Sequence, residues 1–244
     1  MKPFIFDARN GIHIIDLSKT LTQLEAACNF LGETVRKGGK VLFVGTKKQA
    51  QQAVKDTAKD CGQYHVTERW LGGTLTNFAT IKRSIARLKH IEKMEADGTI
   101  NNYVKQEQSV LRREAVRLHK FFDGIRAMDK LPAALFVVDI KREHNAVAEA
   151  RRLKIPVVAI VDTNCDPDLV DFPIAANDDA IRSVRMILAT LGQVITQAHA
   201  EYEAKYARRK PEAAESPAPA AEAAPAPGPA EAAPAPAVAA GSEA

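Results

Sequence analysis

The sequence predicts an α/β protein with a doubly wound parallel sheet and an antiparallel, coiled-coil helical hairpin inserted midway. Continuously apolar runs at residues 41–44, 133–138 and 156–161 are typical of strands that are covered on both faces. Segments with helical periodicity separate these runs, and strand–helix alternation favours parallel pairing. From residue 75 to residue 124 only helical periodicity remains, so we expect the hairpin there.

Local signals define the elements that precede the hairpin. A β-branched run at residues 12–17 is interpreted as the first strand. Thr22 and Glu25 have the spacing of a capping box, so the first helix is expected to begin at Ser18 or Thr22. The remaining elements expected here are the end of that helix at Gly38-Gly39, the strand at 41–44, a helix that follows Gly45-Thr46-Lys47-Lys48 and reaches about Asp60, and a short strand at 64–66.

The segment that joins this region to the hairpin is Arg69-Trp70-Leu71-Gly72-Gly73-Thr74-Leu75-Thr76-Asn77-Phe78, which holds the only tryptophan of the chain. Its glycine pair allows backbone conformations closed to other residues and close approach of another surface. Thr74, Thr76 or Asn77 is expected to cap the next helix. We interpret the segment as the hinge of the hairpin, with Trp70 packed rather than stacked on a nucleobase.

The hairpin itself is predicted from two apolar repeats. The first consists of Ile81, Ile85, Leu88, Ile91 and Met94, and the second places Leu111, Leu118 and Ile125 at intervals of seven. The segment carries ten Lys and Arg against six Asp and Glu. A charged outer face on such a hairpin is commonly only solvated, so this pattern alone does not establish a binding surface.

After the hairpin, strand and helix alternate again. The strands at 133–138 and 156–161 are each followed by an aspartate, at the edge where open α/β sheets hold ligands. A short edge segment is expected at 172–175, and Asn177-Asp178-Asp179 opens the last long helix. The predicted domain organisation is an α/β domain at 1–74 and 125–205, a hairpin insertion at 75–124, and a disordered Ala/Pro/Glu-rich tail at 206–244.

Composition places most of the positive charge in the body of the chain. The last 34 residues, from Pro211, hold 16 Ala, 8 Pro and 5 Glu but no Lys, Arg or aromatic residue. The preceding residues therefore carry 34 basic against 25 acidic side chains, a net charge of +9 that is compatible with nucleic-acid binding. Three widely spaced cysteines suit a reducing compartment, and no apolar run approaches the ~20 residues of a membrane helix. We expect a cytoplasmic protein.

Two loops could hold a ligand. Gly45-Thr46-Lys47-Lys48 lies between a buried strand and a helix, where free amides and ammonium groups attract anions. The loop matches neither G-x-x-x-x-G-K-[ST] nor G-x-G-x-x-G, so an RNA phosphate or an ordinary turn competes there with a nucleotide. The loop from Asp162 to Asp168 fails as a calcium site because Pro167 and Pro173 stand where glycine and glutamate are needed.

Catalytic and metal patterns are otherwise weak. Asp139 and Asp162 follow two strands and could together hold magnesium, but an Asx-rich structural turn explains the second loop equally well. The six histidines have no metal-ligand spacing, and G-x-S-x-G is absent. His144 beside Glu143 is the nearest acid–base pair. The sequence thus disfavours an enzyme and predicts no metal, no cofactor and no small-molecule substrate.

Several long motifs resemble one protein family over about residues 2–205. They are Phe4-Ile5-Phe6 with Arg9-Asn10-Gly11-Ile12-His13-Ile14-Ile15-Asp16-Leu17, Val44-Gly45-Thr46-Lys47-Lys48-Gln49-Ala50, Arg69 to Asn77, and Asp162 to Pro167. In order and spacing they are similar to the second protein of the small ribosomal subunit, bacterial type. Family members usually begin with a further helical segment that contains a Gly-His-Phe-Gly-His-like motif. We expect that this segment is missing here either because the start was assigned downstream or because this protein has lost the segment and some of its contacts.

The resemblance implies a flavodoxin-like α/β domain with a helical hairpin and no catalysis. It also implies binding to small-subunit rRNA, docking of the large first protein of that subunit, and a location in the ribosome with no membrane partner. The leading hypothesis is therefore a structural ribosomal protein, and the alternative is a nucleotide-binding α/β enzyme that uses the Gly45 loop. The candidate RNA-binding residues are Lys47, Lys48 and Arg69, which lie in matched motifs, and, from charge and position, Lys82, Arg83, Arg87, Arg112, Arg113 and Arg117.

Overall fold

The structure is a computed structural model that describes the backbone of residues 1–212 and the side chains of residues 1–206. Its last helix, α6 (Ile181–Glu212), continues past residue 206, where the tail was expected to begin. The predicted disorder of residues 213–244 lies outside the described residues. No helix within the described part of the chain has the length and the apolar run needed to cross a bilayer.

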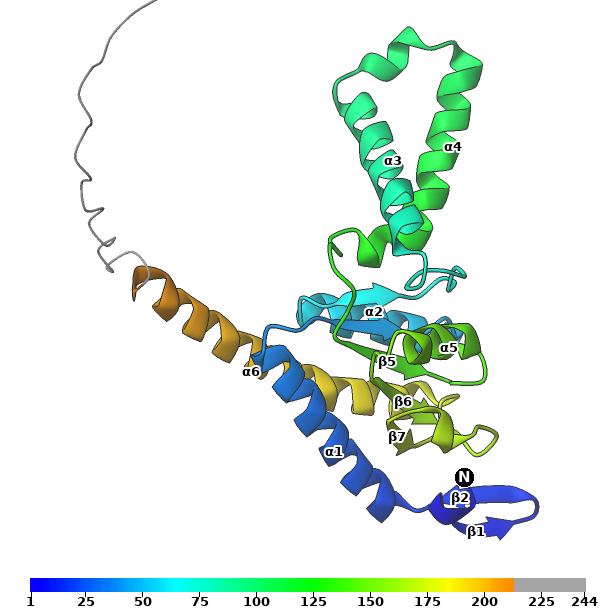
Figure 1. Ribbon diagram of the computed structural model, residues 1–244. Helices are drawn as coiled ribbons and strands as arrows, with labels where there is room; N and C mark the ends of the chain where they lie inside the picture. The colour runs from blue at the N-terminus through cyan, green and yellow to red at the C-terminus, as the bar shows by residue number, and fades with distance from the viewer. Residues whose placement is uncertain (213–244) are drawn as a thin grey trace, which may run out of the picture.

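The centre of the body is a five-stranded parallel sheet in the order β4-β3-β5-β6-β7 (Figure 1). Its strands are β3 (Val41–Val44), β4 (Tyr64–Val66), β5 (Ala134–Val138), β6 (Val157–Val161) and β7 (Phe172–Ala175). Every residue of β3, β5 and β6 is buried, as their apolar runs predicted. Strand order reverses between β3 and β5, which is the flavodoxin-like arrangement.

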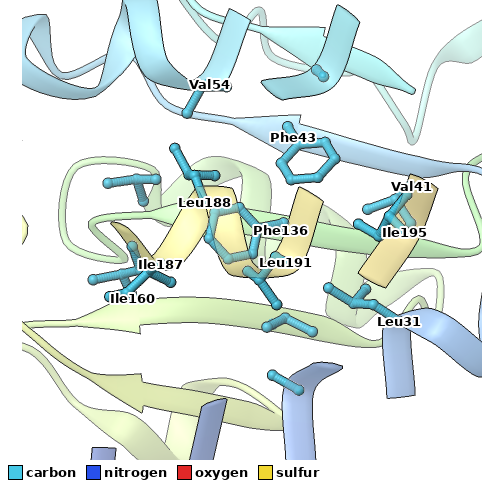
Figure 2. Packing of buried hydrophobic residues seen from close by; sticks show 14 of the residues in the cluster. Leu31, Val41, Phe43, Val54, Phe136, Ile160, Ile187, Leu188, Leu191 and Ile195 are labelled. Carbon is cyan, nitrogen blue, oxygen red and sulfur yellow. The ribbon is translucent and has the colours of Figure 1, made fainter. Parts of the chain in front are cut away.

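Helices cover both faces of this sheet. On one face, α1 (Leu17–Arg36), α2 (Lys48–Asp60) and α6 pack together. Phe43 and Phe136 point from the strands into this layer, where Leu31 of α1, Val54 of α2 and Leu188 of α6 meet them (Figure 2). On the other face, α5 (His144–Arg152), the Trp70 loop and the base of the hairpin cover a second apolar cluster. The doubly wound prediction is confirmed.

The hairpin projects from the body as an arm (Figure 1). It consists of α3 (Phe78–Ala96), η2 (Thr99–Asn102), α4 (Lys105–Phe122) and η3 (Asp123–Ile125). The five apolar residues predicted for the first helix are all buried. In α4 only Phe122 is buried, and Leu111 and Leu118 of the predicted repeat are half-buried. At the return to the body, a Cβ on Gly124 would lie 2.0 Å from the His65 carbonyl oxygen, so this contact needs glycine.

The strand predicted at residues 12–17 is present, but it is the second strand of the chain and lies outside the parallel sheet. Its first residues form β2 (Ile12–Ile15), which pairs antiparallel with β1 (Ile5–Arg9) in a separate hairpin after the short η1 (Lys2–Phe4). Asn10 and Gly11 both have positive φ and make the tight turn between the strands. Asn-Gly between two strand-like segments is a strong hairpin signal, and it is the feature of the sequence that marks this element.

The start of α1 also differs from the prediction. Asp16, not Ser18 or Thr22, is the N-cap, and its carboxylate accepts a hydrogen bond from the Ser18 amide at 3.0 Å. Helix α1 in turn covers the free edge of the sheet: the Thr20 hydroxyl donates to the Ala175 carbonyl at 2.6 Å, and Gln23 accepts from the Ala175 amide at 2.9 Å. Side chains of a helix thus satisfy polar groups that an exposed edge strand leaves open.

Candidate nucleic-acid interface

The hinge between body and arm is organised around the carboxylate of Glu149. Its Oε1 accepts hydrogen bonds from the Trp70 indole N–H at 3.0 Å and the Gly73 amide at 2.8 Å. Its Oε2 accepts from the Leu75 amide at 2.9 Å and from both the amide and the hydroxyl of Thr76. One side chain of α5 therefore holds the whole turn of the loop.

The glycine pair makes this turn possible. Gly73 has φ +86°, in the left-handed region that a residue with a side chain adopts only at a cost, and this conformation lets successive amides point at one carboxylate. Burial raises the pKa of Glu149, but the hydrogen bonds from Trp70, Thr76, Leu75 and Gly73 outweigh it and hold that pKa below its ordinary value. Glu149 is thus ionised and acts as a fixed anion inside the loop.

Trp70 and Arg69 point to different surroundings. Trp70 is 7% exposed and packs in the apolar cluster that includes Leu75 and Ile81, so its predicted packing role is confirmed. Arg69 is exposed. The predicted side-chain cap of α3 is wrong: Asn77 is the N-cap residue but its side chain makes no capping bond, and the Thr74 hydroxyl donates to the Leu71 carbonyl at 2.6 Å. Thr76 is engaged by Glu149 instead.

Lys47 is held by carboxylates of its own chain. Its ammonium lies 2.8 Å from Asp178, 2.6 Å from Asp179 and 3.8 Å from Asp139, and the side chain is 14% exposed. The carboxylates outweigh burial and raise the pKa of Lys47, which keeps it charged. An ammonium in this position is not free for a phosphate, so we assign Lys47 to the internal ion cluster. Lys48, the next residue, is exposed.

The crevice at the strand-order reversal is closed by contacts between the β3 and β5 loops. Buried Glu143 accepts hydrogen bonds from the Thr46 amide at 3.1 Å and from the Thr46 hydroxyl, and Arg142 donates to that hydroxyl at 2.9 Å. Asp139 sits here with φ +68°, a strained conformation for a residue with a side chain. An amide that a nucleotide phosphate would need is already bonded, which counts against the enzyme alternative.

A cluster of acids surrounds the Lys47 ammonium. Ligand atoms of Asp162, Asp178 and Asp179 lie within 4.8 Å of one another, and Lys47 bonds two of these three residues. The ammonium therefore supplies the positive charge that so many carboxylates require. Burial raises the pKa of Asp178 to about 6, and the charges of Asp139 and Asp162 act in the same direction against the lowering effect of Lys47.

The remaining candidate residues lie on the exposed faces of the arm. Arg87 and Arg112 make pairs across the hairpin, with Glu114 at 3.4 Å and Glu95 at 3.7 Å respectively. Lys82 lies over the Phe78 ring, 5.1 Å from its centroid. Among residues 1–206, the candidates that have no carboxylate partner are Lys48, Arg69, Lys82, Arg83, Arg113 and Arg117.

Sequence reasoning missed Glu149 and the partners of Lys47. The glycine pair predicted that the loop around Gly73 comes close to another part of the molecule. The structure shows that this part is the Glu149 carboxylate, 76 residues away in the chain. Glu149 occupies an ordinary helix position with no local pattern to mark it. The one sequence feature that could have indicated this contact is the glycine-containing turn, because the free amides of such a turn bind an anion.

Comparison with protein families gives one finding. The family model described as "Ribosomal protein S2" matches residues 1–198. The match includes the sheet, the arm and the Glu149 hinge. It ends within α6, before the Ala/Pro-rich residues.

Replacing Glu149 with Gln should lower the free energy of unfolding by about 2 kcal/mol, because five donors lose a charged acceptor and at least two of them then face the amide NH2 group. Urea unfolding measures the change, and the fluorescence of Trp70, the only tryptophan, reports the loop directly. Because the pKa of Glu149 is lowered, its stabilisation should shrink as pH falls through that pKa. Glu33→Gln, at an exposed α1 position, is the control; equal stability of both variants would refute the role of Glu149.

A second prediction concerns pH. The folded chain should take up a proton at Asp178 near pH 6, whereas the unfolded chain does so only near the ordinary value of 3.8. Stability from this group is therefore present below pH 4 and lost as pH rises through about 6. Relative to D178N, wild-type stability should fall between about pH 4 and pH 7, as measured by urea unfolding across that range. Lys47→Met should extend this fall to higher pH, because it removes the lowering effect of Lys47 on the pKa of Asp178. Parallel curves for wild type and D178N would contradict this account.

Proposed function

Because this chain belongs to the ribosomal protein S2 family, whose members are structural constituents of the small ribosomal subunit and not enzymes, we propose that it binds small-subunit rRNA through its arm and hinge. We further propose that it helps to dock the large first protein of that subunit for translation, within cytoplasmic ribosomes. The family match supports the structural role, and the exposed charges of the arm support this contact surface.

The observation that carries the proposal is a set of exposed cations without acidic partners. Lys82 and Arg83 lie on the first turns of α3, and Arg113 and Arg117 lie one turn apart on α4. Proteins recognise structured RNA mainly through phosphates and shape, so cations spread over a projecting rigid element suffice. Arg69, exposed on the hinge, adds a cation at the base of the same arm.

Three candidate residues are proposed as weaker RNA contacts or are left out of the RNA-binding surface. Arg87 and Arg112 are proposed as weaker contacts, because each must share its charge with a carboxylate across the hairpin. Lys47 is left out, since releasing it would leave buried Asp178 without its ammonium partner. Lys48 remains a proposed contact at the start of α2.

The alternative, a nucleotide-binding enzyme, needs an open crevice beyond β3. Thr46 and Glu143 bridge that crevice, and nothing in the family match favours the alternative. In sedimentation of a cell lysate through a gradient, a chain that stayed at the top and bound ATP or NAD saturably would support the enzyme alternative. Sedimentation with small subunits is the result expected here.

The proposed interface predicts a specific loss of salt dependence. Each phosphate contact contributes about 0.7–0.9 to the slope of log affinity against log salt, so Arg83→Gln should lower that slope by up to about this amount. The measurement is a filter-binding titration of small-subunit rRNA at several salt concentrations. Lys37→Gln removes the same charge from the exposed C-cap residue of α1, which pairs with Glu33, and it should leave the slope unchanged. Equal slopes for both variants would contradict the proposed surface.

A further inference from the structure

The arm is attached to the sheet at its return as well as at the Glu149 hinge. There η3 lies against β4, the edge strand at this end of the sheet (Figure 1). The Tyr64 hydroxyl donates a hydrogen bond to the Ala127 carbonyl at 3.3 Å, and Gly124 packs directly on His65. Within the described sheet β4 pairs with β3 alone, so contacts of side chains hold this second attachment.

His65 is the buried polar group at the centre of this attachment. The residue is only 6% exposed, and its ring Nδ1 has no hydrogen-bond partner among residues 1–206. A Cβ on Gly124 would lie 2.6 Å from both Cγ and Cδ2 of the imidazole, so the Gly124 backbone and the ring are in close contact. Because this contact leaves little room, the ring can find a partner for Nδ1 only if the Gly124 backbone moves away.

The surroundings of His65 favour its neutral form. Burial, the largest influence, lowers the pKa of His65 below its ordinary value of 6.5. Asp123 raises that pKa, whereas Lys55 and Lys59 of α2 lower it again. Asp123 is also shared with other groups, since its carboxylate lies 3.8 Å from the Lys55 ammonium and 3.7 Å from the His119 ring. It therefore compensates only in part for a charge on His65.

The other charged groups that face this attachment neutralise each other. Lys120 of α4 and Glu68, which follows β4, pair at 3.1 Å. Both residues line, with His65, a cleft of about 180 Å³ between the body and the end of α4. A proton can reach the imidazole through this cleft, but both carboxylates that line it, Glu68 and Asp123, already have cationic partners.

We propose that His65 and Gly124 form an acid-sensitive latch, which holds the return of the arm against the sheet and releases it when His65 takes up a proton. An imidazolium has an N–H group at each ring nitrogen, so protonation in the closed latch buries a charge and a donor without an acceptor. Separation of η3 from β4 lets water solvate both. The hinge stays closed at the same pH, because hydrogen bonds hold the pKa of Glu149 below its ordinary value and keep the carboxylate ionised. Acid thus loosens one attachment of the arm and spares the other.

The pH range of the latch follows from the direction of the His65 shift. In the open latch His65 takes up a proton near its ordinary pKa of 6.5, and in the closed latch it does so only at lower pH. Closure is therefore strongest above pH 6.5. Below that value the ratio of closed to open latch falls by up to about tenfold for each pH unit, until the pKa of the closed form is reached. The latch is a property of this chain and does not depend on rRNA binding.

Hydrogen exchange on the full chain tests the latch. Protection factors, corrected for intrinsic exchange rates, are measured from about pH 7.5 to about pH 5. Below pH 6.5 we expect the protection of residues 122–128 to fall by up to about tenfold per pH unit, while Val157–Val161 of β6 keep theirs. His65→Phe, which keeps a planar ring but cannot be protonated, should make the protection of 122–128 independent of pH. His119→Gln, which removes the other histidine near Asp123, should keep the wild-type dependence.

A second variant tests the latch without altering the buried ring. Lys55→Gln removes a cation that opposes the protonation of His65 and frees Asp123, so the loss of protection at residues 122–128 between about pH 7 and pH 5 should be smaller than in wild type. Protection that does not change with pH in wild type, or that falls equally in wild type and His65→Phe, overturns the latch. An equal fall in β6 reports global unfolding and overturns it as well.

Discussion

The carboxylate of Glu149 is the point on which the geometry of this protein depends. It binds the indole of Trp70 and the amides of Gly73, Leu75 and Thr76, and so fixes a loop that has no strand or helix of its own. Glu149 belongs to α5, which packs on the sheet, while the loop leads directly into α3. The direction in which the arm leaves the body is therefore set by one half-buried acid together with the apolar cluster at the base of the arm.

A second set of internal contacts occupies the position at which proteins of this fold commonly bind a ligand. In open α/β sheets that place is the carboxyl edge at the reversal of strand order. Here Lys47 joins Asp178 and Asp179 there, and Thr46 bonds Glu143, so side chains of the chain itself occupy the position. The same architecture that carries a cofactor in other proteins serves as a rigid base for the arm. Membership of a structural ribosomal family agrees with this arrangement.

The sequence allowed prediction where the determining interactions are local. The apolar runs predicted β3, β5 and β6, because a strand buried on both faces is continuously apolar in sequence. The helical repeat predicted the buried face of α3, because a helix buried along one stripe has apolar residues at helical spacing. Asn10-Gly11 contained the signal for the N-terminal hairpin, although the β-branched run after it was assigned to the sheet. Lys47 could not be judged in this way, since Asp178 lies 131 residues away. Charge and a matched family motif made it a candidate for RNA, whereas the ion pairs with Asp178 and Asp179 appear only in the folded structure.

The central claim is that the arm and hinge bind rRNA while the sheet edge remains an internal ion cluster. The most direct test is a structure of the small ribosomal subunit assembled with this chain. We predict rRNA phosphates within hydrogen-bond distance of Arg83, Arg113 and Arg117, with Lys47 still bonded to Asp178. An arm that contacts no rRNA, or a Lys47 ammonium released from Asp178 onto a phosphate, would contradict the account.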